Sequence, residues 1–184
     1  MDPIVPIEIP GTAFQPGFSV YIIEVIVDDV PFGYYIGMTG DGHYPSARSS
    51  FHRLAGHFDR SAASTQNQLG RVLAEEMADV DYRRFKVKKY SVPVSGFVPI
   101  SGATKRKGDE TYFKAERFKP QYDAYLGRRE AVAALEDNLI YLFKSDPTKR
   151  CLNKTSGKRC EITCPELHTR FIQVREQFNL QTPT

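Results

Sequence analysis

Short apolar runs separated by turn residues dominate the first forty positions of the chain. Residues 19–27 are rich in Val and Ile and predict a strand, and residues 34–38 predict a second one. The turn between them is expected at Asp28, Asp29 and the stretch from Pro31 to Gly33. A third strand is predicted over 82–90, where basic residues alternate with Phe85 and Val87.

Helical periodicity follows in four further segments. The spacing predicts helices over 46–58, with Ser46 as the N-cap, and over 65–78, 121–144 and 165–178. A short hairpin is expected between 151–153 and 160–163. Together these elements predict an α+β fold with a small, mostly antiparallel three-stranded sheet flanked by helices.

Two segments fall outside this pattern. Residues 1–17 hold four of the twelve prolines and predict an extended N-terminal arm. Residues 91–120 show neither the alternation of a strand nor the spacing of a helix, and we interpret them as an insertion. The remainder, 18–184, is the size of a single domain.

Composition narrows the class of protein. A hydrophobic fraction of 41% supports a packed core, and no stretch approaches the roughly 18 apolar residues of a membrane span. The N-terminus lacks the basic start and apolar run of a secretory signal, so a cytoplasmic location is expected.

Charge is distributed unevenly along the chain. Residues 1–80 carry 4 Lys/Arg against 10 Asp/Glu, whereas residues 81–160 carry 19 against 9. A local excess of this size attracts a polyanion such as DNA or RNA. A solvated basic surface without a partner explains the same numbers.

The cysteines number three, so they form no closed disulfide framework. With His168, residues Cys151, Cys160 and Cys164 offer four zinc-type ligands, but their spacing matches no zinc module. We therefore expect reduced thiols and no zinc site there.

Glu136 is out of place on the longest predicted helix. It shares a face with Val132, Leu139, Ile140 and Phe143. A carboxylate on an apolar stripe is unfavourable unless an arginine or a divalent cation pairs with it. A glutamate at the rim of the stripe is the alternative.

Four other polar residues indicate a functional site when they are considered as a set. Arg53 and His57 are four residues apart and share one side of their helix, and Tyr21 and Tyr35 come from the first two strands. Each is ordinary by itself. Two phenols, a guanidinium and an imidazole are groups that handle phosphate.

The chain resembles the GIY-YIG nuclease family at these positions. Ser19-Val-Tyr21 stands where the family has Gly-Ile-Tyr, and Tyr35-Ile-Gly37 reproduces its second signature. Arg53 followed by His57, and Glu136 followed seventeen residues later by Asn153, are similar to the family's later motifs. The resemblance covers about 18–58 and 130–154. Ser19 replaces the first glycine, Met38 stands where some members carry lysine, and 91–120 is additional.

The resemblance implies hydrolysis of a phosphodiester with one Mg²⁺ or Mn²⁺ ion held by Glu136. Arg53 is expected to bind the scissile phosphate through its planar guanidinium. Tyr21 is the candidate general base, with Tyr35 orienting water or exchanging roles with it, and His57 relaying the proton. Asn153 is expected to position Glu136 or a substrate oxygen.

Double-stranded DNA is the expected partner, although nothing in the sequence discriminates against RNA. A homodimer would supply two active centres for two strands. The candidate nucleic-acid contacts are Arg83, Lys86, Lys88, Lys105, Arg106, Lys107, Arg128, Arg129, Lys158 and Arg159.

The sequence is compatible with several biological roles. A stand-alone restriction or host-defence endonuclease is favoured, because the expected catalytic fold takes up most of the chain. A repair or structure-specific nuclease, a nuclease toxin, and a non-catalytic nucleic-acid-binding protein of the same fold are the alternatives.

Overall fold

The computed structural model describes residues 8–42, 45–59, 61, 66–77, 84–98 and 118–181. The fold is α+β, with a three-stranded antiparallel sheet in the order β2-β1-β3. The elements are η1 (Gly11–Phe14), β1 (Phe18–Val27), β2 (Val30–Met38), α1 (Ser50–His57), α2 (Gln68–Glu76), β3 (Phe85–Val94), α3 (Lys119–Ser145) and α4 (Pro165–Gln177).

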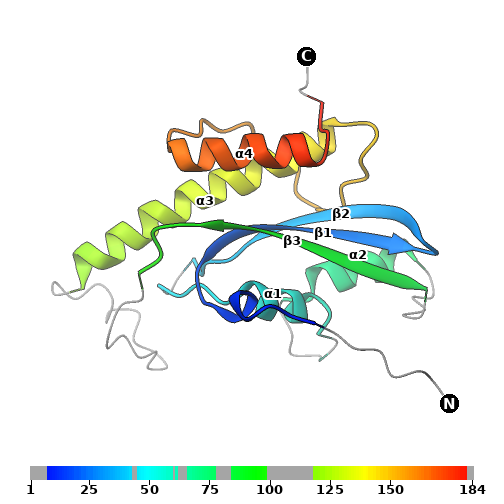
Figure 1. The fold of residues 1–184 in the computed structure, drawn as a ribbon, viewed down its shortest axis with the longest axis horizontal. Helices are drawn as coiled ribbons and strands as arrows, with labels where there is room; N and C mark the ends of the chain where they lie inside the picture. The colour runs from blue at the N-terminus through cyan, green and yellow to red at the C-terminus, as the bar shows by residue number, and fades with distance from the viewer. Residues whose placement is uncertain are drawn as a thin grey trace.

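Helices cover both faces of this sheet (Figure 1). Because side chains alternate along β1, Ile22 packs with Leu139 and Phe143 of α3 on one face, and Ile23 packs with Leu73 of α2 on the other. The central strand is therefore buried from both sides, which explains why both of its faces are mainly apolar, with Ser19 and Glu24 as polar exceptions. None of the described helices is long and apolar enough to cross a membrane.

The turn between β1 and β2 is shorter than the sequence suggests. Asp28 and Asp29 alone form it, with φ of 48° and 64°, the left-handed conformation that a two-residue hairpin requires. Asp tolerates this conformation better than most residues. Pro31 lies inside β2 and not in the turn, and the β1–β2 register shifts at this point. An edge strand accepts proline because its outer N–H has no strand partner.

Other helix and strand boundaries also differ from the predicted ones. The first helix begins at Ser50 and not near residue 46, because the Ser49 side chain accepts the His52 N–H as the N-cap. Ser46 instead offers its carbonyl oxygen to the Tyr125 hydroxyl, at 2.9 Å. The third strand continues to Val94, so residues 91–94 belong to the sheet. Residues 99–117 of the expected insertion lie outside the described part of the chain.

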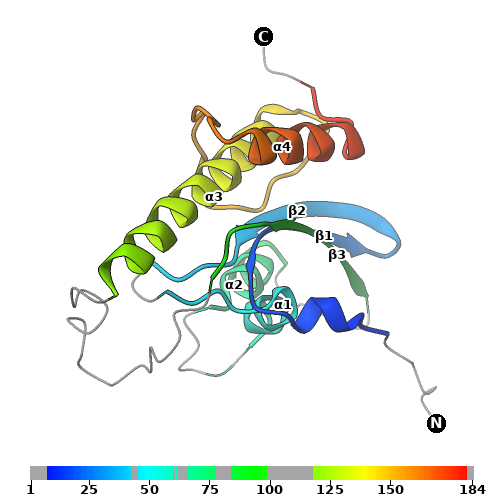
Figure 2. The ribbon, with the colours of Figure 1, turned by 60° about the vertical axis from the view of Figure 1, so that its left-hand side comes forward.

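The arm at residues 8–17 is not wholly extended, because η1 forms within it. The rings of Phe14 and Phe51 lie 5.0 Å apart and join η1 to α1. Figure 2 shows η1 beside α1 on the side of the sheet away from α3 and α4.

The predicted C-terminal hairpin is wrong. Cys151 forms a parallel bridge with Tyr34 of β2, whereas Cys160 is held on α3 by both amide groups of Asn138. Gly157 adopts φ 67°, and a Cβ there would lie 2.5 Å from the carbonyl oxygen of Asp137. The two segments bond to different elements, and the hydrogen bonds of the described residues do not join them to each other.

Candidate active site

The outer edge of β2 places two of the predicted residues next to each other. Asn153 Oδ1 accepts the Ile36 N–H at 2.8 Å, and its Nδ2 donates to the Ile36 carbonyl at 2.7 Å. Two residues further along, the Met38 backbone N–H donates to the Glu136 carboxylate. Successive outward-facing groups of one strand therefore fix Asn153 and then Glu136. Asn153 pairs its amide with both backbone groups of Ile36, which makes it a positioning residue for the strand that carries Tyr35.

Tyr21 and His57 form a buried pair beneath this strand. The Tyr21 hydroxyl lies 2.7 Å from His57 Nε2, and the two side chains are 0% and 1% exposed. Tyr21 of β1 faces Gly37 of β2, and a Cβ at Gly37 would lie 2.5 Å from Tyr21 Cζ. Glycine at this position makes the room in which the phenol lies.

Tyr35 lies on the other side of the imidazole. Its ring centroid is 4.8 Å from that of His57, and its hydroxyl donates to Gln68 Oε1 at 2.6 Å. The two phenols therefore flank one histidine. The register of β1 and β2 places Tyr21 and Tyr35 on the same face of the sheet, and α1 and α2 supply their partners.

Burial works against ionisation of both phenols. It raises the pKa of Tyr21 above its ordinary value, while the charge and a hydrogen bond of Arg53 lower it and the charge of Glu136 raises it. The pKa of Tyr35 is also raised, again chiefly by burial. Arg53 therefore favours phenolate at Tyr21.

His57 is neutral at physiological pH. Burial, with the charges of Arg53 and Lys89, lowers the pKa of His57 to about 4. Its Nδ1 is buried and has no hydrogen-bond partner among the described residues. A neutral imidazole therefore faces the Tyr21 hydroxyl.

Glu136 is partly buried and has no ion pair in the described chain. Burial and the neighbouring Asp137 raise the pKa of Glu136 to about 7, against the opposing effects of Arg53, Arg129 and the Met38 hydrogen bond. Within the described chain no salt bridge reaches this carboxylate. A divalent cation would hold it ionised, so a carboxylate of this kind fits a hard metal ion.

The described residues contain no group of three or more His, Cys, Asp or Glu that could hold a metal ion. Glu136 would therefore be the main protein ligand, and water and substrate oxygens would fill the other positions. The three thiols are free, and Cys151 and Cys164 lie on different elements, beside Asn153 and Arg128 respectively.

Lys89 belongs to the site although the sequence analysis does not place it there. Its Nζ lies 4.6 Å from the centroid of the Tyr21 ring and donates to the Ser50 carbonyl at 2.6 Å. Burial and the charge of Arg53 lower the pKa of Lys89 to about 8. The alternation in β3 indicates the position of Lys89 from the sequence, because Lys89 falls on the same side of the strand as the apolar Phe85 and Val87. Gln68 carried no such signal.

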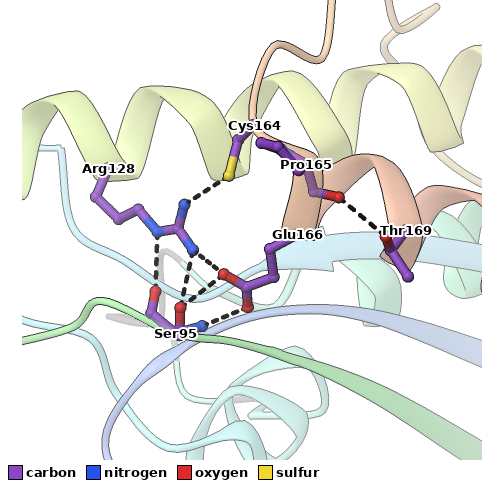
Figure 3. Close-up of polar contacts among 6 residues, drawn as sticks. All are labelled: Ser95, Arg128, Cys164, Pro165, Glu166 and Thr169. Carbon is purple, nitrogen blue, oxygen red and sulfur yellow. Dashed lines mark hydrogen bonds and ion pairs between the residues drawn. The ribbon is translucent and has the colours of Figure 1, made fainter.

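The predicted nucleic-acid contacts divide into several groups. Arg128 is engaged with the Ser95 carbonyl at 2.8 Å, the Cys164 thiol at 3.2 Å and the Glu166 carboxylate, so its guanidinium links β3 to α4 (Figure 3). Arg129 lies close enough to influence Glu136. Lys86 pairs with Asp29 at 2.7 Å on the surface.

The remaining predicted contacts are exposed or not described. Lys88, Lys158 and Arg159 are exposed to solvent. Arg83, Lys105, Arg106 and Lys107 lie outside the described residues. The basic surface that the structure describes is therefore smaller than the sequence indicates.

Comparison of the chain with protein-family models, curated proteins and solved structures found no match.

Proposed function

We propose that this protein is a divalent-metal-dependent endonuclease that hydrolyses phosphodiester bonds in DNA, with a GIY-YIG-like catalytic domain. One observation carries the proposal. Tyr21, Tyr35, Arg53, His57 and Glu136 come from β1, β2, α1 and α3, and they interact through hydrogen bonds, ring contacts or charge. Residues spread over 116 positions of the sequence thus come together at one place in the fold.

Arg53 is the phosphate-binding group of this proposal. Its Nε is buried without a hydrogen-bond partner in the described chain, and no ion pair with a carboxylate is formed there. A planar guanidinium with unused donors matches two phosphate oxygens at once. Arg53 would therefore bind the scissile phosphate and stabilise the charge that develops on it.

Glu136 would hold the cation, with the Met38 N–H as a hydrogen-bond donor to that carboxylate. Mg²⁺ or Mn²⁺, when bound, supplies Lewis-acid stabilisation of charge on the phosphate and the leaving oxygen. The cation would also keep Glu136 ionised, although burial raises the pKa of this side chain to about 7.

Tyr21 would take the proton of the attacking water. The water oxygen forms a bond to phosphorus, the bond to the leaving oxygen breaks, and one water proton moves to the phenolate of Tyr21. Arg53 and Lys89 favour that phenolate by their charges, and neutral His57 can donate its Nε2–H to it. Since the pKa of His57 is about 4, we assign it this hydrogen bond in preference to the storage of a proton.

DNA is the proposed substrate because the described surface carries exposed basic side chains, including Lys88, Lys158 and Arg159, which would contact phosphates without reading sequence. Within this class we favour a restriction or host-defence enzyme. A DNA-repair or structure-specific nuclease is the other proposal that the same geometry supports.

Nicking of supercoiled plasmid tests the function directly. The native chain is expected to convert supercoiled DNA to open-circle and linear forms with Mg²⁺ or Mn²⁺ and to stop with EDTA. Glu136→Gln should lose this activity, whereas Glu130→Gln, an exposed glutamate on the same helix, should retain it. Binding of DNA without metal-dependent cleavage would identify a non-catalytic nucleic-acid-binding protein instead.

A further inference from the structure

A cavity of about 230 Å³ opens between α2 and the outer edge of β2. Its lining includes Tyr35, Gln68, Arg71, Val72, Lys154 and Thr155. This volume lies below the roughly 300–1,000 Å³ of pockets for drug-sized ligands, so the cavity suits one small group.

The polar groups that line this cavity are mainly hydrogen-bond donors. Gln68 Oε1 already accepts the Tyr35 hydroxyl at 2.6 Å, which leaves its amide nitrogen as the donor for a ligand. Thr155 adds a hydroxyl, and Arg71 and Lys154 add two positive charges. No carboxylate lines the described cavity. A lining of donors and cations selects an anion with several oxygens.

The cations at the rim are exposed to solvent. Lys154 pairs with Glu75 at 2.8 Å, and both side chains of that pair are more than half exposed. Surface pairs of this kind contribute little stability and exchange readily for a stronger anion. Arg71 is exposed on α2, one turn after Gln68.

The floor of the cavity is rigid, in contrast. Val72 is buried in the core, and the Asn153 amide is fixed to both backbone groups of Ile36. Tyr35 joins the cavity to the proposed active site, because its hydroxyl faces Gln68 while its ring contacts His57. An anion bound here would lie beside the scissile group and separate from it.

We propose that this cavity is a second phosphate site, which binds the backbone phosphate next to the scissile one in the same DNA strand. This inference rests on the proposed function. The site would set the register of the strand, so that a substrate with a flanking phosphate is held more tightly than one with a single phosphodiester.

The test compares three short ligands on the full-length protein in EDTA, where a metal-dependent enzyme does not cut. The ligands are TpT, with one phosphate, and pTpT and TpTp, which add a phosphate at either end. Affinity is measured by isothermal titration calorimetry, and backbone amide shifts at Gln68 and Thr155 report where the ligand binds. One of the two added phosphates is expected to raise affinity by about tenfold, the effect of a charge-assisted hydrogen bond.

The double variant Arg71→Gln/Lys154→Gln should abolish this gain and leave the affinity for TpT almost unchanged. Arg170→Gln, on α4 across the sheet, is the matched control and should keep the gain. Equal affinity for all three ligands, binding of none of them, or a gain that survives in the double variant would overturn the second site.

The two proposals fail in different ways. A protein that cuts plasmid but shows no gain from the added phosphate retains the nuclease function and lacks this site. A protein that shows the gain but never cuts DNA retains the phosphate site and loses the nuclease proposal.

Discussion

The Tyr21 hydroxyl and His57 Nε2 are 2.7 Å apart, and neither side chain is more than 1% exposed. A histidine in this position is neutral because burial and two nearby cations oppose its protonation. The pair therefore has consequences for stability that are measurable without a substrate.

We expect His57 to make the protein less stable in acid. Its pKa of about 4 lies below the ordinary value of 6.5, so between these values the unfolded chain binds a proton that the native protein does not. The stabilising contribution is present above pH 6.5 and is lost as the pH falls towards 4. It amounts to about 3 kcal/mol in the free energy of unfolding.

Urea denaturation between pH 4.5 and 7.5 measures this effect. His57→Gln should flatten the acid decline relative to the native protein, and His52→Gln, an exposed histidine on the same helix, should not. Comparison with the native protein is essential, because Glu136 acts in the opposite direction over part of this range. An unchanged pH dependence in His57→Gln would show that this histidine is not held neutral.

Gly37→Ala should disturb the Tyr21–His57 pair, because Gly37 lies opposite Tyr21 on the neighbouring strand. The added methyl group would lie about 2.5 Å from Tyr21 Cζ, so the phenol has to move away from His57. We expect a loss of about 1–3 kcal/mol in the free energy of unfolding, together with a large loss of cleavage. Thermal unfolding and plasmid nicking measure the two effects.

Gly127→Ala is the matched control for that substitution. A Cβ at Gly127 meets no other atom within 4 Å, and the residue lies in α3. Alanine there should stabilise the protein by up to about 1 kcal/mol, because glycine is a poor helix former. Equal behaviour of the two variants would argue against close packing at Gly37.

Much of the fold follows from local patterns. The many Val and Ile residues of β1 and the apolar stripe on α3 predict two central elements, and the one carboxylate on that stripe identifies Glu136 as a candidate from the sequence alone. Patterns of this kind are reliable because the periodicity of side chains is a property of the element itself.

The rest depends on partners that a local pattern does not contain. Residues 151–163 look like a hairpin until Asn138 of α3 takes up the backbone groups of Cys160. Lys89 looks like one more basic residue until the register of β3 places it over the Tyr21 ring. In both cases a contact distant in sequence decides the outcome.

Lys89→Met should weaken catalysis by removing a positive charge near Tyr21. The ammonium group lies 4.6 Å from the centroid of the phenol ring, where it favours phenolate. We expect kcat at pH 7 to fall at least about tenfold and the acid limb of the pH–rate profile to move to higher pH. KM should change less.

Two further variants separate charge from packing. Lys89→Arg keeps the charge and should restore part of the activity, and Lys144→Met, at the exposed end of α3, should resemble the native protein. If the pH–rate profile of Lys89→Met coincides with the native one, Lys89 has a packing role alone.

Glu136→Gln should abolish cleavage, and yet the variant should be at least as stable as the native protein at pH 8. The pKa of Glu136 is about 7, above its ordinary 4.5, so the native state favours the protonated form. That contribution to stability is present below pH 4.5 and is lost as the pH rises through 7. Glutamine remains uncharged at every pH and can still accept the Met38 N–H, so the free energy of unfolding at pH 8 should rise by about 1–3 kcal/mol.

Metal binding gives an independent readout of the same residue. Millimolar Mg²⁺ or Mn²⁺ should raise the Tm of the native protein at pH 8, because a ligand that binds only the folded state stabilises it. The shift should be absent in Glu136→Gln and present in Glu130→Gln. Retained cleavage in Glu136→Gln or Glu136→Ala at any metal concentration would remove Glu136 from the proposed mechanism, because no other described carboxylate accompanies the two phenols and Arg53.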